Sequence, residues 1–258
     1  MSRNTGAWPE GTPAWVDLMV TDLSQAQDFY GGLFAWDFNE ASRGTGGYAI
    51  ASVDGDAVAG VGELSAEAAA PSASWTTYLA VNNADVTAAK IRAAGGRLSV
   101  DPVDVPGGRM AIAHDPGGAY FGLWQSGSRT GATVVREPST VCWNEMLTRD
   151  FPATTTFYTT VFGYTTSDMT DEDFVYCSLE LEGTPVSGIG KLPAGVPAEI
   201  PAHWMTYFAC ADTDATVDRA IGLGALVLNE PVDAGFGRLA VLEGPEGEVF
   251  SVVTMHGQ

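Results

Sequence analysis

Basic residues are scarce in this chain. Its 258 residues include only 12 Lys and Arg against 32 Asp and Glu, which gives a formal net charge of −20. A surface of this sign repels phosphate backbones and anionic lipid headgroups. We therefore expect neither nucleic acid nor a membrane among the partners of the protein.

Cysteine and histidine are also rare, with three residues of each. An odd number of cysteines, all in strand-like apolar runs of the second half, is typical of buried thiols in a reducing compartment. The first ten residues lack the apolar segment of a signal peptide, so we expect a cytoplasmic protein, with export without a signal peptide as the alternative. The cysteines are Cys142, Cys177 and Cys210.

The motifs of several enzyme classes are absent from the sequence. It contains no Gly-x-Ser-x-Gly nucleophile elbow and no Walker loop. These absences remove the usual sequence signatures of serine hydrolases and of P-loop nucleotide-binding proteins.

What the sequence does contain is a second copy of its own pattern. A shift of 128 residues aligns Trp15–Asp22 with Trp143–Asp150, and a shift of 129 aligns Gly108–Arg109 with Gly237–Arg238. A repeat of this length indicates two fused domains rather than a stacked array. We place the first domain at 1–126, an exposed, flexible linker at 127–138 and the second domain at 139–258.

Each copy reads as two smaller units of a strand, a helix and further strands. The β-favouring run Ala14–Val20 is followed by Asp22, which is placed to cap a helix containing Phe29 and Tyr30. The predicted units are about 13–64 and 75–125 in the first domain, and about 139–192 and 203–255 in the second.

This order of elements resembles a known family. A strand, an Asp-capped helix with Phe-Tyr, three strands and a closing Asp-Pro-x-Gly hairpin are similar to the βαβββ unit of the vicinal oxygen chelate superfamily, which includes glyoxalases, extradiol dioxygenases and bleomycin-resistance proteins. Segments such as Gly11–Leu18 and Gly122–Gln125 resemble its actinobacterial glyoxalase-like subgroup, typified by a mycobacterial culture-filtrate antigen. The resemblance implies an α+β fold, a tandem duplication of glyoxalase-like domains, with four βαβββ units whose curled mixed sheets enclose concave pockets.

The resemblance also implies where a metal would be bound. Family members take ligands from the opening strand of each unit and from the last strand of each domain. Imidazole and carboxylate are the donors that such sites require. None stands at these places, so we expect no metal and no cofactor. The residues there are Trp15, Thr76 and Gly122 in the first copy, and Trp143, Met205 and Ser251 in the second.

Strand alternation predicts the lining of the two concavities. It directs Trp15, Asp17 and Met19 inward in the first copy, and Trp143 and Glu145 in the second. Aromatic walls with few polar groups suit a flat organic ligand, although plain core filling is the alternative. The same argument adds Tyr78, Tyr120, Gly122 and Trp124 to the first concavity, and Tyr207, Val249, Ser251 and Val253 to the second.

Two carboxylates among these apolar neighbours are the candidate catalytic residues. A buried, unpaired carboxylate is costly, so Asp17 and Glu145 should have either a partner or a raised pKa. Arg109 and Arg238, which are equivalent in the two copies, are the expected counter-ions and candidate ligand-binding residues. A structural ion pair, or a carboxylate bonded to backbone, is the alternative to a role in catalysis.

Three functions are compatible with these features. The first is a metal-free protein that binds a small apolar or aromatic molecule, with sequestration or resistance as the role that the resemblance implies. The second is a metal-independent isomerase, cyclase or lyase of secondary metabolism, with Asp17 or Glu145 as general base. The third is a surface or secreted interaction protein. We expect a small-molecule partner, a monomer or homodimer, and a first concavity that is more open than the second.

Overall fold

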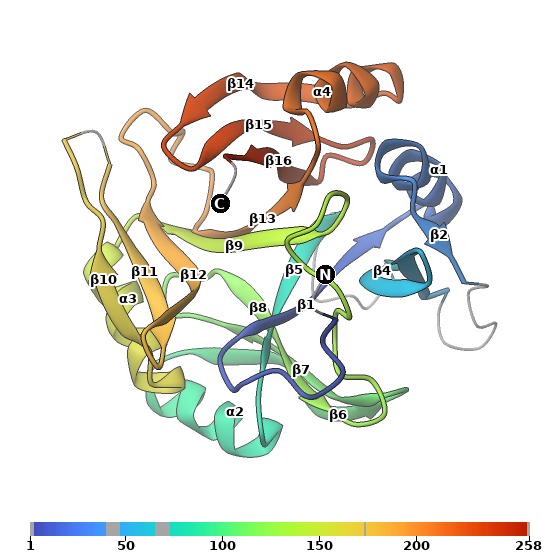
Figure 1. Ribbon diagram of the computed structural model, residues 1–258. Helices are drawn as coiled ribbons and strands as arrows, with labels where there is room; N and C mark the ends of the chain where they lie inside the picture. Colours follow the sequence, from blue (N-terminus) through green and yellow to red (C-terminus); the bar gives the residue numbers. More distant parts are fainter. Residues whose placement is uncertain (1–2, 40–46, 65–72, 173, 257–258) are drawn as a thin grey trace.

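Two mixed β-sheets and four helices make up the described part of the protein (Figure 1). The structure is a computed structural model that describes residues 3–39, 47–64, 73–172 and 174–256. Each sheet has eight strands and comes from one half of the chain. The α+β class expected from the sequence is therefore confirmed.

The first sheet has the strand order β2-β3-β4-β1-β5-β8-β7-β6. At its centre β1 runs parallel to β4 and antiparallel to β5, and β5 runs parallel to β8. The strands are β1 (Pro13–Val20), β2 (Asp37–Phe38), β3 (Ala49–Val53), β4 (Asp56–Glu63), β5 (Ser74–Ala80), β6 (Arg97–Val105), β7 (Gly108–His114) and β8 (Tyr120–Ser126).

The second sheet repeats this order as β10-β11-β12-β9-β13-β16-β15-β14. Its central strands pair in the same directions as their counterparts in the first sheet. The strands are β9 (Val141–Thr148), β10 (Thr165–Asp168), β11 (Tyr176–Leu181), β12 (Thr184–Lys191), β13 (His203–Ala209), β14 (Leu226–Ala234), β15 (Gly237–Glu243) and β16 (Val249–Met255).

Each helix begins at a polar cap. The predicted cap of the first helix is confirmed, because Asp22 Oδ1 accepts the Gln25 N–H at 3.0 Å. Asn83, Asp150 and Asp212 cap the others in the same way. No helix in the described ranges is long and apolar enough to cross a membrane. The helices are α1 (Leu23–Phe34), α2 (Ala84–Ala93), α3 (Phe151–Phe162) and α4 (Thr213–Gly222).

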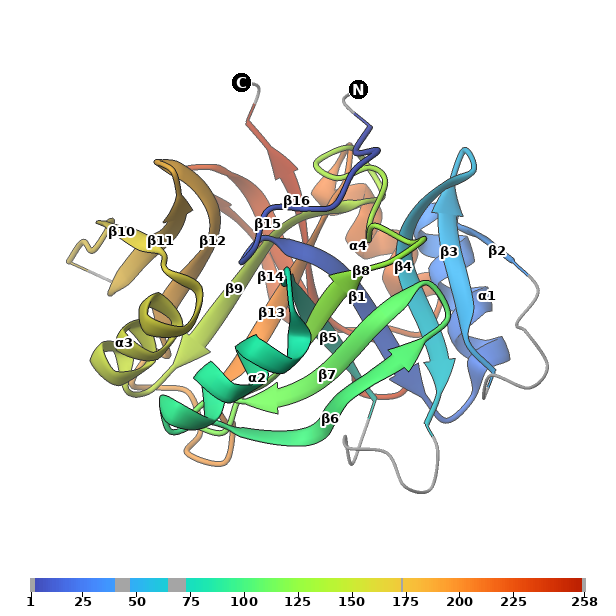
Figure 2. The same ribbon diagram turned by 90° about the horizontal axis from the view of Figure 1, so that it is seen from below.

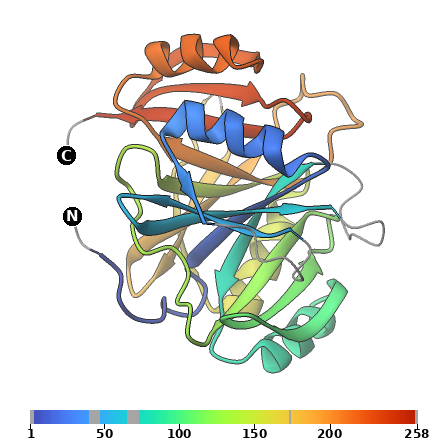
Figure 3. The same ribbon diagram turned by 90° about the vertical axis from the view of Figure 1, so that its right-hand side faces the viewer.

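The two halves of the chain share their hydrophobic cores. One core joins α1 and β1 to α4, β15 and β16, and the other joins α2, β7 and β8 to α3, β9 and β11. Accordingly, α1 lies alongside α4 (Figure 3), and α2 lies near α3 on another side of the molecule (Figure 2). Each core therefore depends on residues from both copies.

A buried chain of hydrogen bonds joins the copies within each core. In the first, Trp75 donates to Tyr30 at 3.1 Å, and Tyr30 donates to the Glu248 carboxylate at 2.9 Å. The equivalent chain in the second core runs from Trp204 through Tyr158, at 2.9 Å, to Asp115, at 3.5 Å. The phenols thus hold carboxylates that would be costly to bury alone.

The two carboxylates of these chains come from different positions in the repeat. Asp115 and Ala119 align with Gly244 and Glu248 at the 129-residue shift. A Cβ atom at Gly244 would overlap the Glu248 carboxylate. The second copy has therefore moved its carboxylate four residues along the turn while keeping the group in the same place.

The linker at 127–138 is irregular but only partly exposed, which corrects in part the expectation of an exposed linker. Ala132 and Val134 are buried. The backbone N–H of Ala132 donates to Ala14 at 2.7 Å, and that of Thr133 donates to Ala57 at 2.8 Å. This segment is held along the first sheet, whereas residues 65–72, between the two predicted units of the first copy, lie outside the described residues.

Candidate functional site

Each sheet has one face that none of the described helices covers. On β1, Val16, Leu18 and Val20 pack in the core with α1, while Trp15 belongs to a separate cluster without any helical residue. A corresponding helix-free cluster lies on the second sheet and includes Val253. We call these surfaces the first and second helix-free faces; they carry the side chains that alternation directs inward.

The first helix-free face holds Asp17 in a cluster of aromatic side chains. Asp17 is only 5% exposed. Tyr48 donates its hydroxyl to Asp17 Oδ2 at 3.3 Å, and Trp15 Nε1 donates to the Tyr48 oxygen at 2.9 Å. Burial raises the pKa of Asp17 to about 7, against the lowering effect of hydrogen bonds from Tyr78, Tyr48 and Thr76. Asp17 Oδ1 has no hydrogen-bond partner among the described residues.

The second helix-free face repeats this arrangement around Glu145. Tyr207 donates to Glu145 Oε1 at 2.6 Å, and Trp143 Nε1 donates to the Tyr176 hydroxyl at 3.0 Å. Burial raises the pKa of Glu145, while hydrogen bonds from Tyr207 and Tyr176 lower it. At the centre of each face, two phenols therefore hold a carboxyl group.

Tyr48 and Tyr176 are site residues that the sequence analysis missed. They stand 128 residues apart, the shift of the repeat, which is the signal that could have revealed them. A Cβ atom at Gly60 would overlap the hydroxyl of Tyr48, and one at Gly188 would overlap that of Tyr176. The two glycines make room for the phenols that reach the carboxylates.

The expected ion pairs with Arg109 and Arg238 are wrong. Arg109 contacts Asp85 at 3.1 Å and Asp104 at 2.8 Å, and Arg238 binds the equivalent Asp214 and Asp233. On β7 it is Met110, the next residue, that packs on the first helix-free face. Arg109 therefore points to the opposite face, where it ties α2 to the sheet.

The expectation that the first face is the more open is also wrong. Trp15, Tyr78 and Trp124 are only 6%, 5% and 7% exposed, because they pack on one another. The Tyr78 ring also covers Gly122, so the missing side chain leaves no free space.

The second face lacks part of this filling. Its Trp143, Glu145 and Tyr207 are half-buried. Val249 and Val253 stand where the first copy has Tyr120 and Trp124. The loss of two large rings explains why the aromatic side chains of the second face stay accessible.

The remaining predicted residues lie on these same faces. Met19 and Tyr120 are half-buried on the first, where the Tyr120 hydroxyl bonds to Ser74. Ser251 is fully buried beside Tyr207 in the parallel pair of β13 and β16. Its hydroxyl has no hydrogen-bond partner within the described ranges.

The donor set does not fit a catalytic metal on either face. Asp17 lies opposite Thr76, and Glu145 lies opposite Met205, so the described part of the chain offers a single carboxylate at the centre of each face. The three histidines and three cysteines add no ligands: within the described residues, no group of three His, Cys, Asp or Glu side chains is placed to bind a metal ion.

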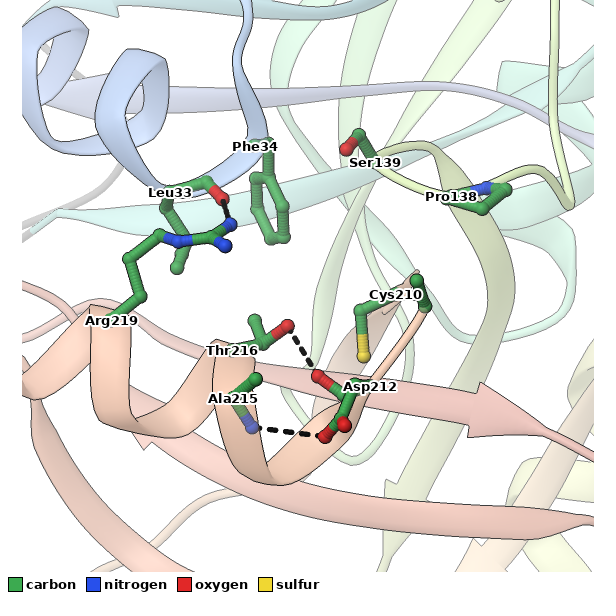
Figure 4. Close-up of a pocket in the computed structure, with 10 residues that line it drawn as sticks. Leu33, Phe34, Pro138, Ser139, Cys210, Asp212, Ala215, Thr216 and Arg219 are labelled. Atoms are coloured by element: carbon green, nitrogen blue, oxygen red, sulfur yellow. Dashed lines mark hydrogen bonds between the residues drawn. The ribbon is translucent and has the colours of Figure 1, made fainter.

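A separate small cavity lies where the two copies meet, between α1 and α4 (Figure 4). Its volume is about 160 Å³. Arg219 reaches across it to donate to the Leu33 carbonyl at 3.1 Å, and Asp212 on its floor caps α4. Arg219 therefore links α4 to α1, and Asp212 stabilises the start of α4. The cavity is distinct from the helix-free faces.

Comparison with known proteins places the chain in a family. Residues 12–123 match the Glyoxalase/Bleomycin resistance protein/Dioxygenase superfamily, and residues 140–253 match the glyoxalase-like domain. The chain belongs to this superfamily, the vicinal oxygen chelate proteins, as its sequence resemblance indicated.

Named relatives extend over nearly the whole chain. A Mycobacterium tuberculosis protein named "Putative glyoxylase CFP32" is 39% identical over 252 residues, which cover 95% of each chain. The anthracycline biosynthesis protein DnrV of Streptomyces peucetius is 38% identical over 260 residues, covering 95% of this chain and 94% of its own.

Solved structures share the fold at low sequence identity. The Mn(II)-bound glyoxalase from Novosphingobium aromaticivorans superposes with a TM-score of 0.65 at 16% identity, covering 95% of this chain and 83% of its own. The catechol dioxygenase BphC also gives 0.65, at 14% identity, with 95% and 87% covered.

Proposed function

We propose that this protein is a metal-independent member of its superfamily that binds a small apolar or aromatic molecule. In this proposal its four βαβββ units form curled sheets whose helix-free faces hold the ligand, and sequestration or resistance is its role. The observation that carries the proposal is the half-buried aromatic lining around Glu145, at a place where the described residues offer no set of metal donors.

The named relatives support the choice of ligand class. DnrV and DauV are each named as anthracycline biosynthesis proteins, and they match 95% of this chain. Flat fused rings stack well on Trp and Tyr side chains such as Trp143 and Tyr207. The second helix-free face is the principal site in this proposal, because the rings of the first face are already buried against one another.

One specific observation favours an enzyme as the second candidate. The carboxyl group of Asp17 has a pKa raised to about 7 and an oxygen without a partner among the described residues. A general base works best when its pKa lies near the working pH. A metal-independent isomerase, cyclase or lyase of secondary metabolism would use Asp17 in this way once the rings of the first face move to admit a substrate, with Glu145 as the equivalent group on the second face.

Titration with a hydroxyanthraquinone, followed by tryptophan fluorescence, tests the proposed binding. We expect saturable quenching, and Trp143→Ala should weaken the affinity by about 1 to 3 kcal/mol. Trp15→Ala is the matched control and should have little effect on binding. If no saturable binding occurs, the binding proposal is wrong; if Trp15→Ala has the larger effect, the ligand lies on the first face.

The enzyme candidate needs a separate measurement. Incubation of the hydroxyanthraquinone with the protein, followed by mass spectrometry, would detect a rearranged or eliminated product. Loss of product formation in Asp17→Asn with retained binding would support a general base. Unchanged product formation in that variant would remove Asp17 from the chemistry.

A further inference from the structure

The second helix-free face surrounds a carboxyl group with electron-rich rings. Tyr207 and Tyr176 both bond to Glu145, and Trp143 bonds to Tyr176. These four residues are half-buried rather than buried, so each keeps part of its surface accessible. Aromatic faces carry negative potential, which adds to the charge of the carboxylate.

No cation of the protein balances this group within the described residues. The ion pairs there do not include Glu145, and Arg238, its expected partner, is bound by Asp214 and Asp233. His203 pairs with Leu147 across β9 and β13 and so shares this face, but burial lowers its pKa. The imidazole is therefore neutral at neutral pH.

A second acid lies toward the rim of the same face. Glu243 pairs with Val249 across β15 and β16, and Val249 stands two residues before Ser251, the partner of Tyr207 in the pairing of β13 with β16. Glu243 is half-buried. The whole molecule has a net charge of −20, so its field also concentrates cations at the surface.

We propose that the ligand of the second helix-free face is an organic cation, a protonated amine carried on a flat apolar body. The rings stack on the body and the Glu145 carboxylate binds the ammonium group, as in aromatic cages for alkylammonium ions. This inference rests on the proposed function and adds the charge of the ligand to it.

The packing of the first helix-free face explains why we expect only the second face to bind the cation. Asp17 occupies the place that corresponds to Glu145, but it is only 5% exposed, on a face where Trp15, Tyr78 and Trp124 form a buried cluster. An ammonium group on a ring has no access there without moving these side chains. Variants at Asp17 therefore serve as matched controls for variants at Glu145.

A pair of probes with the same ring system tests the charge. Calorimetric titration at pH 7 would compare 1-naphthylmethylamine, which is protonated, with neutral 1-naphthalenemethanol. We expect the amine to bind the wild type at least about tenfold more tightly. Glu145→Gln should abolish this preference by weakening the amine alone, whereas Asp17→Asn should leave it unchanged.

Tyr207→Phe provides a second variant that keeps the charge. It removes one hydrogen bond to Glu145 but leaves the ring, so the preference for the amine should persist. Equal binding of both probes by the wild type, or a preference that survives Glu145→Gln, would overturn the inference and leave the proposed function standing. If neither probe binds, the inference and the proposed function both fail.

Discussion

Replacing Asp17 by Asn should stabilise the protein at alkaline pH and have little effect at acidic pH. Asp17 is 5% exposed, and its burial raises the pKa from 3.8 to about 7. The folded state therefore binds the proton more tightly than the unfolded chain does. Stability contributed by this group is present below pH 3.8 and is lost as the pH rises to about 7.

The size of the effect follows from the same pKa values. Each tenfold change in acidity corresponds to about 1.4 kcal/mol, so the full change from 3.8 to about 7 corresponds to roughly 4 kcal/mol. Asn has the shape of Asp without the charge and avoids this cost. The difference in unfolding free energy between Asp17→Asn and wild type should grow with pH toward this value.

Urea unfolding of both proteins at pH 4.5, 6 and 8 would measure the difference. Glu145→Gln is the control, and its half-buried position predicts a weaker dependence on pH. A difference that stays constant over this range would show that Asp17 does not titrate there. The assignment of a raised pKa to a buried, metal-free carboxyl group would then be wrong.

Two further predictions concern the contacts between the copies, and a third concerns the metal content of the purified protein. Tyr30→Phe should cost about 1.5 to 3 kcal/mol in urea unfolding, because it removes a buried hydrogen bond to Glu248, whereas Tyr158→Phe should cost less because its bond to Asp115 is 3.5 Å long; equal losses would contradict this. Gly244→Asp should lower the melting temperature, and adding Glu248→Ala should restore it by rebuilding the arrangement of the first copy; a double variant no better than the single one would refute the exchange of positions. Elemental analysis of the purified protein should find no stoichiometric transition metal, and one zinc, nickel or iron per chain that is lost together with activity on chelation would overturn the metal-independent proposal.

The sequence predicted the features of this protein that depend on local pattern or on the repeat. Asp22 as a helix cap and the inward direction of Trp15 follow from neighbouring residues alone, and the structure has both. The repeat predicted that Glu145 would stand where Asp17 stands. The first two features depend on neighbouring residues and the third on the repeat, so none of them requires knowledge of the tertiary contacts.

Features set by distant residues were predicted less well. Tyr48 lies just before β3, outside any clear alternation, and its place beside Asp17 depends on the space left by Gly60. Arg109 was assigned by its equivalence to Arg238, although alternation along β7 directs Met110 to the helix-free face. Long-range packing decided the place of Tyr48, whereas the assignment of Arg109 overlooked the local alternation along its own strand.

The shared cores also affect how the chain folds during its synthesis. Phe34 of α1 packs on Phe208 at 5.1 Å and belongs to a core that includes Val252, whereas the other core contains no residue beyond Trp204. At about 5 to 20 residues per second, a ribosome needs roughly 10 to 40 s to synthesise the chain between Phe34 and Val252. The core that includes Val252 is completed last, yet it contains α1, the first helix to be synthesised. Until synthesis ends, the apolar side of α1 lacks its packing partners, and such an exposed surface is one that chaperones bind.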